Sequence, residues 1–266
     1  MISRLNQPRD QLLQPNLPDK ASFKLIGLGG VGSIVARYLA IFLASLGRSA
    51  RLVLIDGDLF EPSNASRMLF GNCGNKAAVI HEELLPRFAD SSLSLDFIDE
   101  YVTSENIRRL VHDGDIVLLA VDNHATRKLI SDHCATLDDV CLISGGNDGI
   151  EKTTEGQQRR GTFGNAQIYL RSAGSDCTPS LTRFHPEIAQ PGDKNPADKN
   201  CTELITSVPQ ILFANLMVAS TILNTVWLQL CGATHYGEVA FDIQDARMRP
   251  VLQLDNSGTT GEHSAA

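Results

Sequence analysis

The sequence predicts an α/β fold, a doubly wound mixed sheet of the Rossmann-like type. Apolar runs of strand length alternate with helix-like segments as far as residue 146, which is the pattern that parallel crossovers need. One run, residues 115–120, reads D-I-V-L-L-A and is typical of a central strand buried on both faces. The first strand ends in a glycine-rich turn, a third observation that favours this fold.

The chain opens with an arm and a glycine turn. Residues 1–21 hold three prolines and mixed polarity, so they predict an extended arm or a short helix rather than a domain. A strand over 23–26 then breaks into Gly27-Leu28-Gly29-Gly30-Val31-Gly32-Ser33, and an apolar helix is expected over 34–46. Glycines let the backbone pass close to a ligand, and the free N–H groups and dipole of a helix N-terminus attract an anion. The turn therefore predicts an anion site.

The second strand, residues 51–55, leads into a polar cluster. It ends at Asp56, 24 residues beyond Gly32, where an acid commonly holds a ribose hydroxyl. The polar side chains that follow are Asp58, Ser63, Asn64, Arg67 and Lys76. Two cations and an amide beside a phosphate cradle suit a triphosphate under attack, because charge on the transferring group must be stabilised. The loop over 56–70 is expected to cover the nucleotide.

Further elements are expected in order along the chain. The predictions are a helix over 73–88, strands over 93–98, 115–120 and 140–144, and helices over 104–111 and 125–137. Asp122 stands at the carboxyl end of the 115–120 strand, where ligands bind in open α/β sheets. Gly145 and Gly146 are expected to close the last of these strands.

The character of the sequence changes after Gly146. Strands are expected over 162–171, antiparallel to the sheet, and over 236–242 and 248–254, as a hairpin. Residues 172–200 are rich in Pro, Gly, Asp and Lys without periodicity, which predicts a long functional or mobile loop. The small and polar residues 255–266 predict a disordered tail.

Composition narrows the class of protein. A length of 266 residues, 42% of them hydrophobic and 20% charged, is typical of one large or two small globular domains. The net charge of −8 argues against nucleic acid or an anionic membrane as a partner, since both call for a basic face. Six cysteines are too few for a disulfide framework and no signal peptide opens the chain, so a cytoplasmic protein is expected.

One stretch resembles a membrane span. Residues 204–237 contain no Asp, Glu, Lys or Arg, which is long enough to cross a bilayer. Polar Gln210, Asn215, Asn224 and Gln229 interrupt the run. A buried helix, shared with a subunit interface, is therefore the favoured interpretation.

Together these motifs resemble the ubiquitin-activating enzymes and their bacterial relatives, the ThiF/MoeB/HesA adenylyltransferases. The resemblance runs from about residue 24 to about residue 254. It includes the glycine turn, the acid pair Asp56 and Asp58, the S-N-x-x-R motif of Ser63, Asn64 and Arg67, the lysine Lys76, and the motif A-V-D-N-H-A-T-R with Asp122, Asn123 and Arg127. Met68 stands where the family usually has a glutamine. The late segments look most like those of the compact bacterial members.

The resemblance implies an adenylation domain of the ubiquitin-activating-enzyme type. That domain would span residues 22–254, with a nucleotide-binding part over 22–146 and a carrier-binding part with a crossover loop over 147–254. ATP would react with the C-terminal carboxylate of a small ubiquitin-like or sulfur-carrier protein, giving an acyl-adenylate and pyrophosphate. Catalysis would rest on positioning and charge neutralisation, because neither reactant needs a protein base.

The resemblance also assigns roles to individual residues. Those implied for ATP binding are Gly27, Gly29, Gly30, Gly32, Ser33, Asp56, Asp58, Ser63, Asn64, Arg67, Lys76, Asp122 and Asn123. Asn64 and Arg67 would contact the phosphates and the incoming carboxylate, Lys76 the phosphates, and Asp122 the Mg²⁺ ion. The alternatives are that Arg67 and Lys76 form surface ion pairs and that Asp122 caps a helix.

Implied partners and cysteine chemistry complete this set of expectations. A homodimer is expected. In the family the partner subunit often supplies an arginine; Arg4 and Arg9 are the candidates here, and that role stays open. Transfer of the activated carrier to a cysteine, to a conjugating enzyme or to a sulfur donor also stays open. Cys201 resembles a cysteine that some relatives bond covalently to the carrier, with Cys177 as the second candidate and no chemistry as the alternative. No C-x-x-C pair exists, so no structural zinc is expected; a scattered site of Cys177, His185 and Cys201 is the alternative.

Two other functions stay open. An NAD-dependent oxidoreductase fits the glycine fingerprint but leaves Asn64, Arg67 and Lys76 without a role. A catalytically inactive scaffold subunit of an activating complex would use the fold to bind a partner. Retention of Arg67, Lys76 and Asp122 argues against that scaffold.

Overall fold

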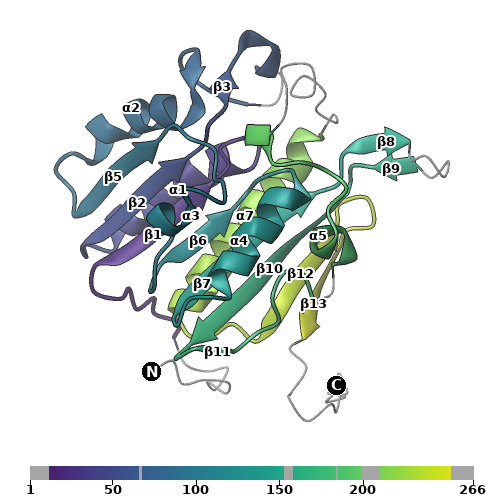
Figure 1. Cartoon of the computed structure of the whole chain (residues 1–266). Helices are drawn as coiled ribbons and strands as arrows, with labels where there is room; N and C mark the ends of the chain where they lie inside the picture. The colour runs from purple at the N-terminus through teal and green to yellow at the C-terminus, as the bar shows by residue number, and fades with distance from the viewer. Residues whose placement is uncertain (1–11, 66–67, 153–157, 184, 199–209, 253–266) are drawn as a thin grey trace.

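A computed structural model of the chain describes residues 12–65, 68–152, 158–183, 185–198 and 210–252 (Figure 1). At its centre lies one mixed sheet, in the order β13-β12-β10-β7-β6-β1-β2-β5, with β11 paired to β10. Its strands are β1 (Ala21–Ile26), β2 (Ala50–Ile55), β5 (Leu93–Ile98), β6 (Ile116–Leu119), β7 (Val140–Asn147), β10 (Phe163–Ser172), β11 (Ser175–Asp176), β12 (Tyr236–Asp242) and β13 (Arg247–Leu252). Two small ladders stand apart from it: β3 (Leu59–Phe60) with β4 (Gly74–Asn75), and β8 (Ile150–Lys152) with β9 (Gln158–Arg160).

Helices cover both faces of the sheet. They are α1 (Gly32–Ser45), α2 (Lys76–Phe88) and α7 (Leu212–Leu230) on one face, and α3 (Ile107–Leu110), α4 (His124–Cys134) and α5 (Pro186–Ala189) on the other. Two 3₁₀ turns are η1 (Pro62–Asn64) and η2 (Pro196–Asp198). Each face has its own apolar core, because the parallel strands are apolar in succession and present side chains to both sides. The predicted doubly wound mixed sheet is confirmed.

The directions of the strands show at which edge of the sheet a ligand site is expected. β5, β2, β1, β6 and β7 are parallel, whereas β10, β12 and β13 continue the sheet antiparallel. From β1 the chain first builds outward through β2 and β5, and then returns to β6 on the other side of β1. The carboxyl ends of β1 and β6 therefore border the crevice where such sheets bind ligands.

The long uncharged helix is part of the core. α7 is long and apolar enough to cross a membrane by length and composition alone. It nevertheless packs on β7, β10 and α1, and Val218, Ala219 and Ile222 on it are fully buried. The predicted buried helix is thus confirmed for residues 212–230; residues 204–209 lie outside the described part of the chain.

Several predicted boundaries are wrong for identifiable reasons. The helix expected from residue 73 begins at Lys76, because Asn75 Oδ1 accepts two N–H groups of its first turn at 2.9 and 3.0 Å. β7 does not end at Ser144 but runs through both glycines to Asn147, since β10 pairs with it along that length. The helices expected over 104–111 and 125–137 are shorter, and the expected loop 172–200 contains β11, α5 and η2. The predicted tail lies outside the described residues.

Candidate functional site

The glycine turn lies at the carboxyl end of β1, in the crevice beside β6. Gly27 has a φ of +87°, and a Cβ there would lie 2.8 Å from Cγ1 of Val121, just after β6. A Cβ on Gly32 would lie 1.8 Å from the carbonyl oxygen of Gly27. Only residues without a Cβ allow the start of α1 to approach β1 this closely.

Four successive backbone N–H groups of this turn are open. Within the described part of the chain, the N–H groups of Gly29, Gly30, Val31 and Gly32 donate no hydrogen bond. They stand at the N-terminus of the 14-residue helix α1, whose dipole also favours negative charge. A run of unpaired N–H groups at a helix N-terminus is an anion-binding arrangement. The turn is thus suited to phosphate oxygens.

Asp56 follows β2 and directs its carboxylate at the same turn. Its Oδ2 accepts a hydrogen bond of 2.5 Å from the Leu28 N–H, and its Oδ1 accepts one of 2.8 Å from the Asp58 N–H. Burial raises the pKa of Asp56 to about 6, although the nearby Lys76 ammonium acts to lower it. The charge of this carboxyl therefore changes close to neutral pH.

Lys76, Asp58 and Tyr101 form a connected group beside Asp56. Asp58 accepts a hydrogen bond of 2.8 Å from Lys76 Nζ, and the Tyr101 hydroxyl donates to its other oxygen. Lys76 is the first residue of α2 and is 6% exposed. Asn75, which caps α2, also donates to the carbonyls of Asp56 and Asp58. The start of α2, with its cation, is therefore fixed to the strand end that carries the acid pair.

The S-N-x-x-R segment lies in η1 and just beyond it. Asn64 ends η1. Phe60 and Phe70, which flank the segment, stack with ring centroids 4.5 Å apart and so close the loop on itself. The side chain of Ser63 and all of Arg67 lie outside the described residues, and their roles stay predictions.

Asp122 follows β6 and is exposed at the carboxyl edge of the sheet. The neighbouring Asn123 is the helix cap, since its Oδ1 accepts a hydrogen bond of 2.7 Å from the first turn of α4. Asp193, from the segment between β11 and α7, accepts two more N–H groups there at 2.8 and 2.9 Å. Capping of α4 is thus supplied by Asn123 and Asp193, and Asp122 is not needed for it.

Arg127 is a buried residue of α4 that hydrogen-bonds to the carboxyl edge of the sheet. It is 6% exposed and donates to Ser144 Oγ at 2.8 Å and to the carbonyls of Val121 and Gly145 at 2.7 and 2.9 Å. Burial lowers the pKa of Arg127 to about 10, against the attraction of Asp122. One buried guanidinium therefore ties the segments after β6 and within β7 together.

His185 is one of the described residues that tether the segment over 177–198 to the body of the protein. Its Nε2 lies 3.0 Å from Glu238 Oε2 on β12, and its Nδ1 lies 2.8 Å from Glu187 Oε1. The hydrogen bond to Glu238 raises the pKa of His185, and partial burial opposes it. A histidine with a raised pKa stabilises the fold fully below the unfolded value of about 6.5, and this contribution is lost as pH rises through the folded pKa.

We therefore predict that the 177–198 segment opens more readily at pH 8.5 than at pH 6. A partly exposed pair contributes about 0.5–1 kcal/mol, so local opening should rise about two- to fivefold. Hydrogen exchange corrected for intrinsic rates, or limited proteolysis, measures it. His185→Gln should remove the difference between the two pH values; a difference that persists in this variant would contradict the assignment.

The structure describes only one of the two cysteines that were considered as nucleophiles. The Cys177 N–H donates to Leu170 O at 2.8 Å, and Leu170 is in register, through β7 and β6, with Phe23 at the amino-terminal part of β1. That register lies four residues before Gly27, about 13 Å along the strands at roughly 3.3 Å per residue. This placement gives Cys177 no support as a nucleophile for a group held at the turn. Cys201 lies outside the described residues.

No group of three or more His, Cys, Asp or Glu side chains that could hold a metal ion occurs among the residues described. His185 is engaged by two glutamates instead.

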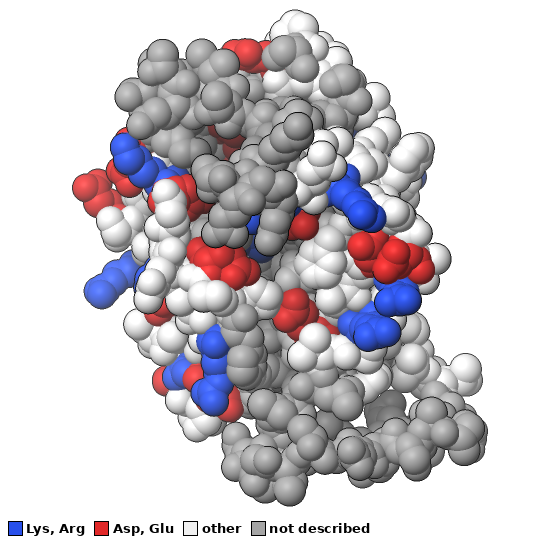
Figure 2. Space-filling model, turned by 90° about the vertical axis from the view of Figure 1, so that its right-hand side faces the viewer, with Lys and Arg blue, Asp and Glu red and all other residues white. Residues whose placement is uncertain are grey.

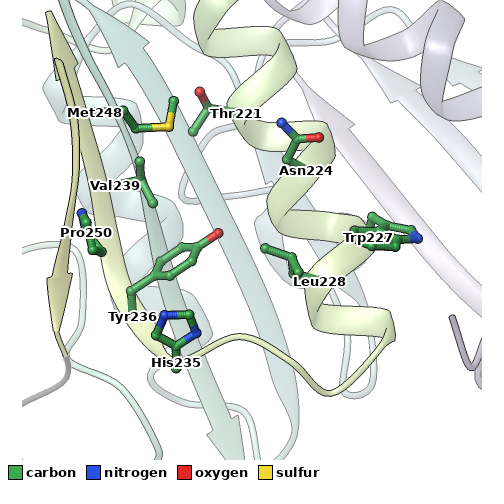
Figure 3. Close-up of a pocket in the computed structure, with 9 residues that line it drawn as sticks. All are labelled: Thr221, Asn224, Trp227, Leu228, His235, Tyr236, Val239, Met248 and Pro250. Atoms are coloured by element: carbon green, nitrogen blue, oxygen red, sulfur yellow. The ribbon is translucent and has the colours of Figure 1, made fainter. Parts of the chain in front are cut away.

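A separate cavity of about 470 Å³ lies between α7 and the β12–β13 hairpin (Figure 3). The residues lining it are Thr221, Asn224, Trp227, Leu228, His235, Tyr236, Val239, Met248 and Pro250. None of them is Lys or Arg, whereas a triphosphate needs cations or a run of N–H donors. The glycine turn, and not this cavity, is the candidate nucleotide site.

The sequence analysis assigned no role in the site to three residues that the fold brings to this region. Tyr101 follows β5, Asp193 lies in the long segment before α7, and Asn215 on α7 packs against Gly30. For Tyr101 a signal existed, because it lies just beyond a predicted parallel strand, at the edge where ligands bind. The other two come from segments far along the chain.

Comparison with known proteins places this geometry in a family. The model of the ThiF family matches residues 14–241. The adenylyltransferase and sulfurtransferase MOCS3-1 of Zea mays is 28% identical over 253 residues, which cover 92% of this chain and 47% of that protein. The heterocyst protein HesA of Trichormus variabilis is 27% identical over 186 residues, covering 66% of this chain and 61% of the relative. The chain thus spans about half the length of the MOCS3 relatives that it matches.

Solved structures agree on the fold. A crystal structure of Escherichia coli MccB with ATP superposes with a TM-score of 0.61 at 16% identity, covering 88% of this chain and 64% of that one. The PaaA structure gives a TM-score of 0.60 at 17% identity, covering 87% and 72%. At this level of identity the likeness concerns the fold alone. The family match, in contrast, extends over most of the sequence, and the chain belongs to the ThiF family.

Proposed function

We propose that this protein is an ATP-dependent adenylyltransferase that activates the C-terminal carboxylate of a small ubiquitin-like or sulfur-carrier protein. One observation carries the proposal: four open N–H groups of the glycine turn lie beside the acid Asp56, which is in turn close to the buried cation Lys76. This is a phosphate cradle, an acid suited to a ribose, and a charge for the phosphates within one crevice. Relatives named as adenylyltransferases, such as MOCS3-1, support the reaction class.

The nucleotide would lie across the turn. Gly27, Gly29, Gly30, Gly32 and Ser33 form the cradle, and Asp56 accepts the ribose hydroxyls. Lys76 is now paired with Asp58 at 2.8 Å, and Tyr101 holds that carboxylate from the other side. A bound phosphate offers the ammonium a second anion at the same place, so the lysine can turn to it without leaving the acid pair.

Magnesium would be held by Asp122 together with the phosphates. A carboxylate exposed at the strand end, and not used as a helix cap, fits a hard cation that keeps most of its waters. When bound, Mg²⁺ supplies neutralisation of phosphate charge. Asn123, the next residue, has its Oδ1 engaged as the cap of α4, which leaves its side-chain NH₂ group as the donor that it would offer to the nucleotide.

The chemical step needs no protein base. A carboxylate oxygen of the carrier attacks the α-phosphorus, the bond to the bridging oxygen breaks, and pyrophosphate leaves with the electron pair. Asn64, Arg67 and Lys76 stabilise the charge on the transferring phosphoryl group, and the turn holds the rest of the nucleotide in position. Cys201 is the proposed acceptor where a thioester follows.

ATP–pyrophosphate exchange tests the proposal. Exchange that requires a small carrier protein ending in glycine supports it. Binding of NADH with no exchange would replace it with an oxidoreductase, and tight carrier binding with no exchange would replace it with an inactive scaffold.

The partners follow from the same proposal. The SAMP-activating enzyme E1 of Haloferax volcanii is 29% identical over 113 residues, which cover 41% of this chain and 40% of that protein, and its name says that it activates SAMP. Figure 2 shows acidic and basic side chains interspersed over one face of the molecule, and the net charge is −8, which suits a protein partner better than nucleic acid. We place the enzyme in the cytoplasm on composition, with no membrane partner.

A homodimer is part of the proposal. α1 and α7 pack side by side, and each exposes large apolar residues: Tyr38 is 59% exposed on α1, and Phe213 is 70% exposed on α7. Aromatic residues are enriched at protein interfaces, which supports an interface on these two helices. An arginine from the partner subunit, Arg4 or Arg9, and transfer to a conjugating enzyme also belong to the proposal.

Asp56 makes nucleotide binding dependent on pH. With its pKa raised to about 6, the carboxyl is mostly ionised at pH 7.5 and mostly protonated at pH 5. A protonated acid accepts ribose hydroxyls less well, so the Kd for ATP should rise about tenfold between these values. Titration calorimetry measures it. Asp56→Asn should bind weakly at both pH values, and an unchanged pH profile in this variant would assign the titration to another group.

A further inference from the structure

Asn215 is a fully buried amide without a hydrogen-bond partner. It lies in the first turn of α7 and is 0% exposed. Neither its Oδ1 nor its Nδ2 has a partner in the described structure. Other buried polar side chains of α7 differ, since the hydroxyl of Thr225 meets that of Tyr236 at 3.2 Å. A buried amide with no partner lowers stability, so its presence calls for a physical reason.

Its amide group is aimed at the glycine turn. A Cβ on Gly30 would lie 2.3 Å from Asn215 Nδ2, and Gln210 Oε1 would be 3.7 Å away. The Asn215 side chain thus fills the space where a side chain at position 30 would stand. Of the atoms of this amide, the donor Nδ2 is the one nearest to the Cβ position of residue 30.

The geometry of the turn suggests what this donor meets. The N–H and C=O groups of one peptide point in opposite directions because the peptide is planar and trans. When an anion draws the open N–H groups of Gly30, Val31 and Gly32 toward itself, the adjoining carbonyls turn the other way. A side-chain donor already packed against Gly30 can then hydrogen-bond to the carbonyl of that residue.

We propose that Asn215 is a positioning residue of the nucleotide site, whose amide becomes hydrogen-bonded only when a phosphate occupies the glycine turn. This rests on the proposed function. Asn215 acts through Gly30 and holds the turn in its anion-binding form. It also connects the turn to α7.

Asn215→Leu tests this proposal, because the substitution should raise the stability of the free protein and weaken its binding of ATP. Leucine has a similar volume and leaves no polar atom unpaired, so the melting temperature of the ligand-free protein should rise by about 2–4 °C. The Kd for ATP with Mg²⁺, by titration calorimetry, should rise about tenfold, which corresponds to about 1.4 kcal/mol. A purely structural asparagine would change the first value and leave the second unaltered.

Matched variants complete the experiment. Asn224→Leu makes the same substitution on the same helix at an exposed position and should leave the Kd unchanged. Asn215→Ala removes the amide without adding bulk and should weaken ATP binding as much as Asn215→Leu does. It also serves as the test variant if Asn215→Leu does not fold. If the wild type binds ATP and both variants at 215 bind it as tightly, the Asn215 inference is overturned. If the wild type binds no ATP, the proposed function itself fails.

Discussion

Replacing Lys76 with methionine is expected to lower the rate of carrier-dependent ATP–pyrophosphate exchange by about 10²–10³-fold, the usual effect of losing one charge-stabilising group. The ammonium is buried, paired with Asp58, and close enough to Asp56 to act on its pKa. Methionine keeps the length of the side chain and removes the charge. The initial rate of exchange at saturating ATP is the quantity to measure.

Two controls separate the loss of charge from a loss of fold. Arg51→Met removes an exposed cation, paired with Asp96 at 2.7 Å, and should leave exchange unchanged. Lys76→Arg keeps the charge and should recover part of the activity. Lys76→Met also removes the positive charge that lowers the pKa of Asp56, so this pKa should rise above its already raised value. Exchange within a factor of three of wild type in Lys76→Met would remove this lysine from the site.

The strand and turn pattern of the first half could be predicted because local chemistry decides it. β1, β2 and β6 are short, largely apolar runs, and β5 alternates apolar and polar residues. A glycine or an acid follows each of these strands within three residues, and their buried side chains leave little freedom of register. The β8–β9 ladder was not predicted, because all its residues except Ile150 are polar and they do not alternate. The continuation of β7 through Gly145 and Gly146 depends on pairing with β10. Because β10 is a separate, later segment, the local sequence of β7 does not predict how far this pairing extends.

The site was predictable only in part, for a related reason. Glycines, acids and a lysine in one stretch indicate a nucleotide crevice by their order alone, because the strand ends carry them to one edge. What each side chain does there depends on neighbours from distant segments. Asp193 takes the capping role that had been considered for Asp122, and Tyr101 holds Asp58. Such contacts arise from the tertiary fold.

The second large effect is expected for Gly32→Ala, which should lower both stability and nucleotide binding. The new Cβ would lie 1.8 Å from the carbonyl oxygen of Gly27 and 2.8 Å from its carbon. Both are backbone atoms, so no rotamer change relieves the contact, and α1 must move away from β1. Overpacking of this kind costs about 3 kcal/mol, which for a chain of this size lowers the melting temperature by roughly 10 °C.

Gly29→Ala is the matched control for the effect of Gly32→Ala on stability, because Gly29 lies in the same turn, three residues before Gly32. Its Cβ would meet only Met68 Cε, at the ordinary contact distance of 3.7 Å, so its melting temperature should stay close to wild type. Thermal unfolding of the three proteins without ligand compares them directly. Equal melting temperatures for Gly32→Ala and Gly29→Ala would mean that α1 and β1 are not held at this spacing. The open N–H groups would then not form one concave surface, and the argument for a phosphate at the turn would lose its geometric basis.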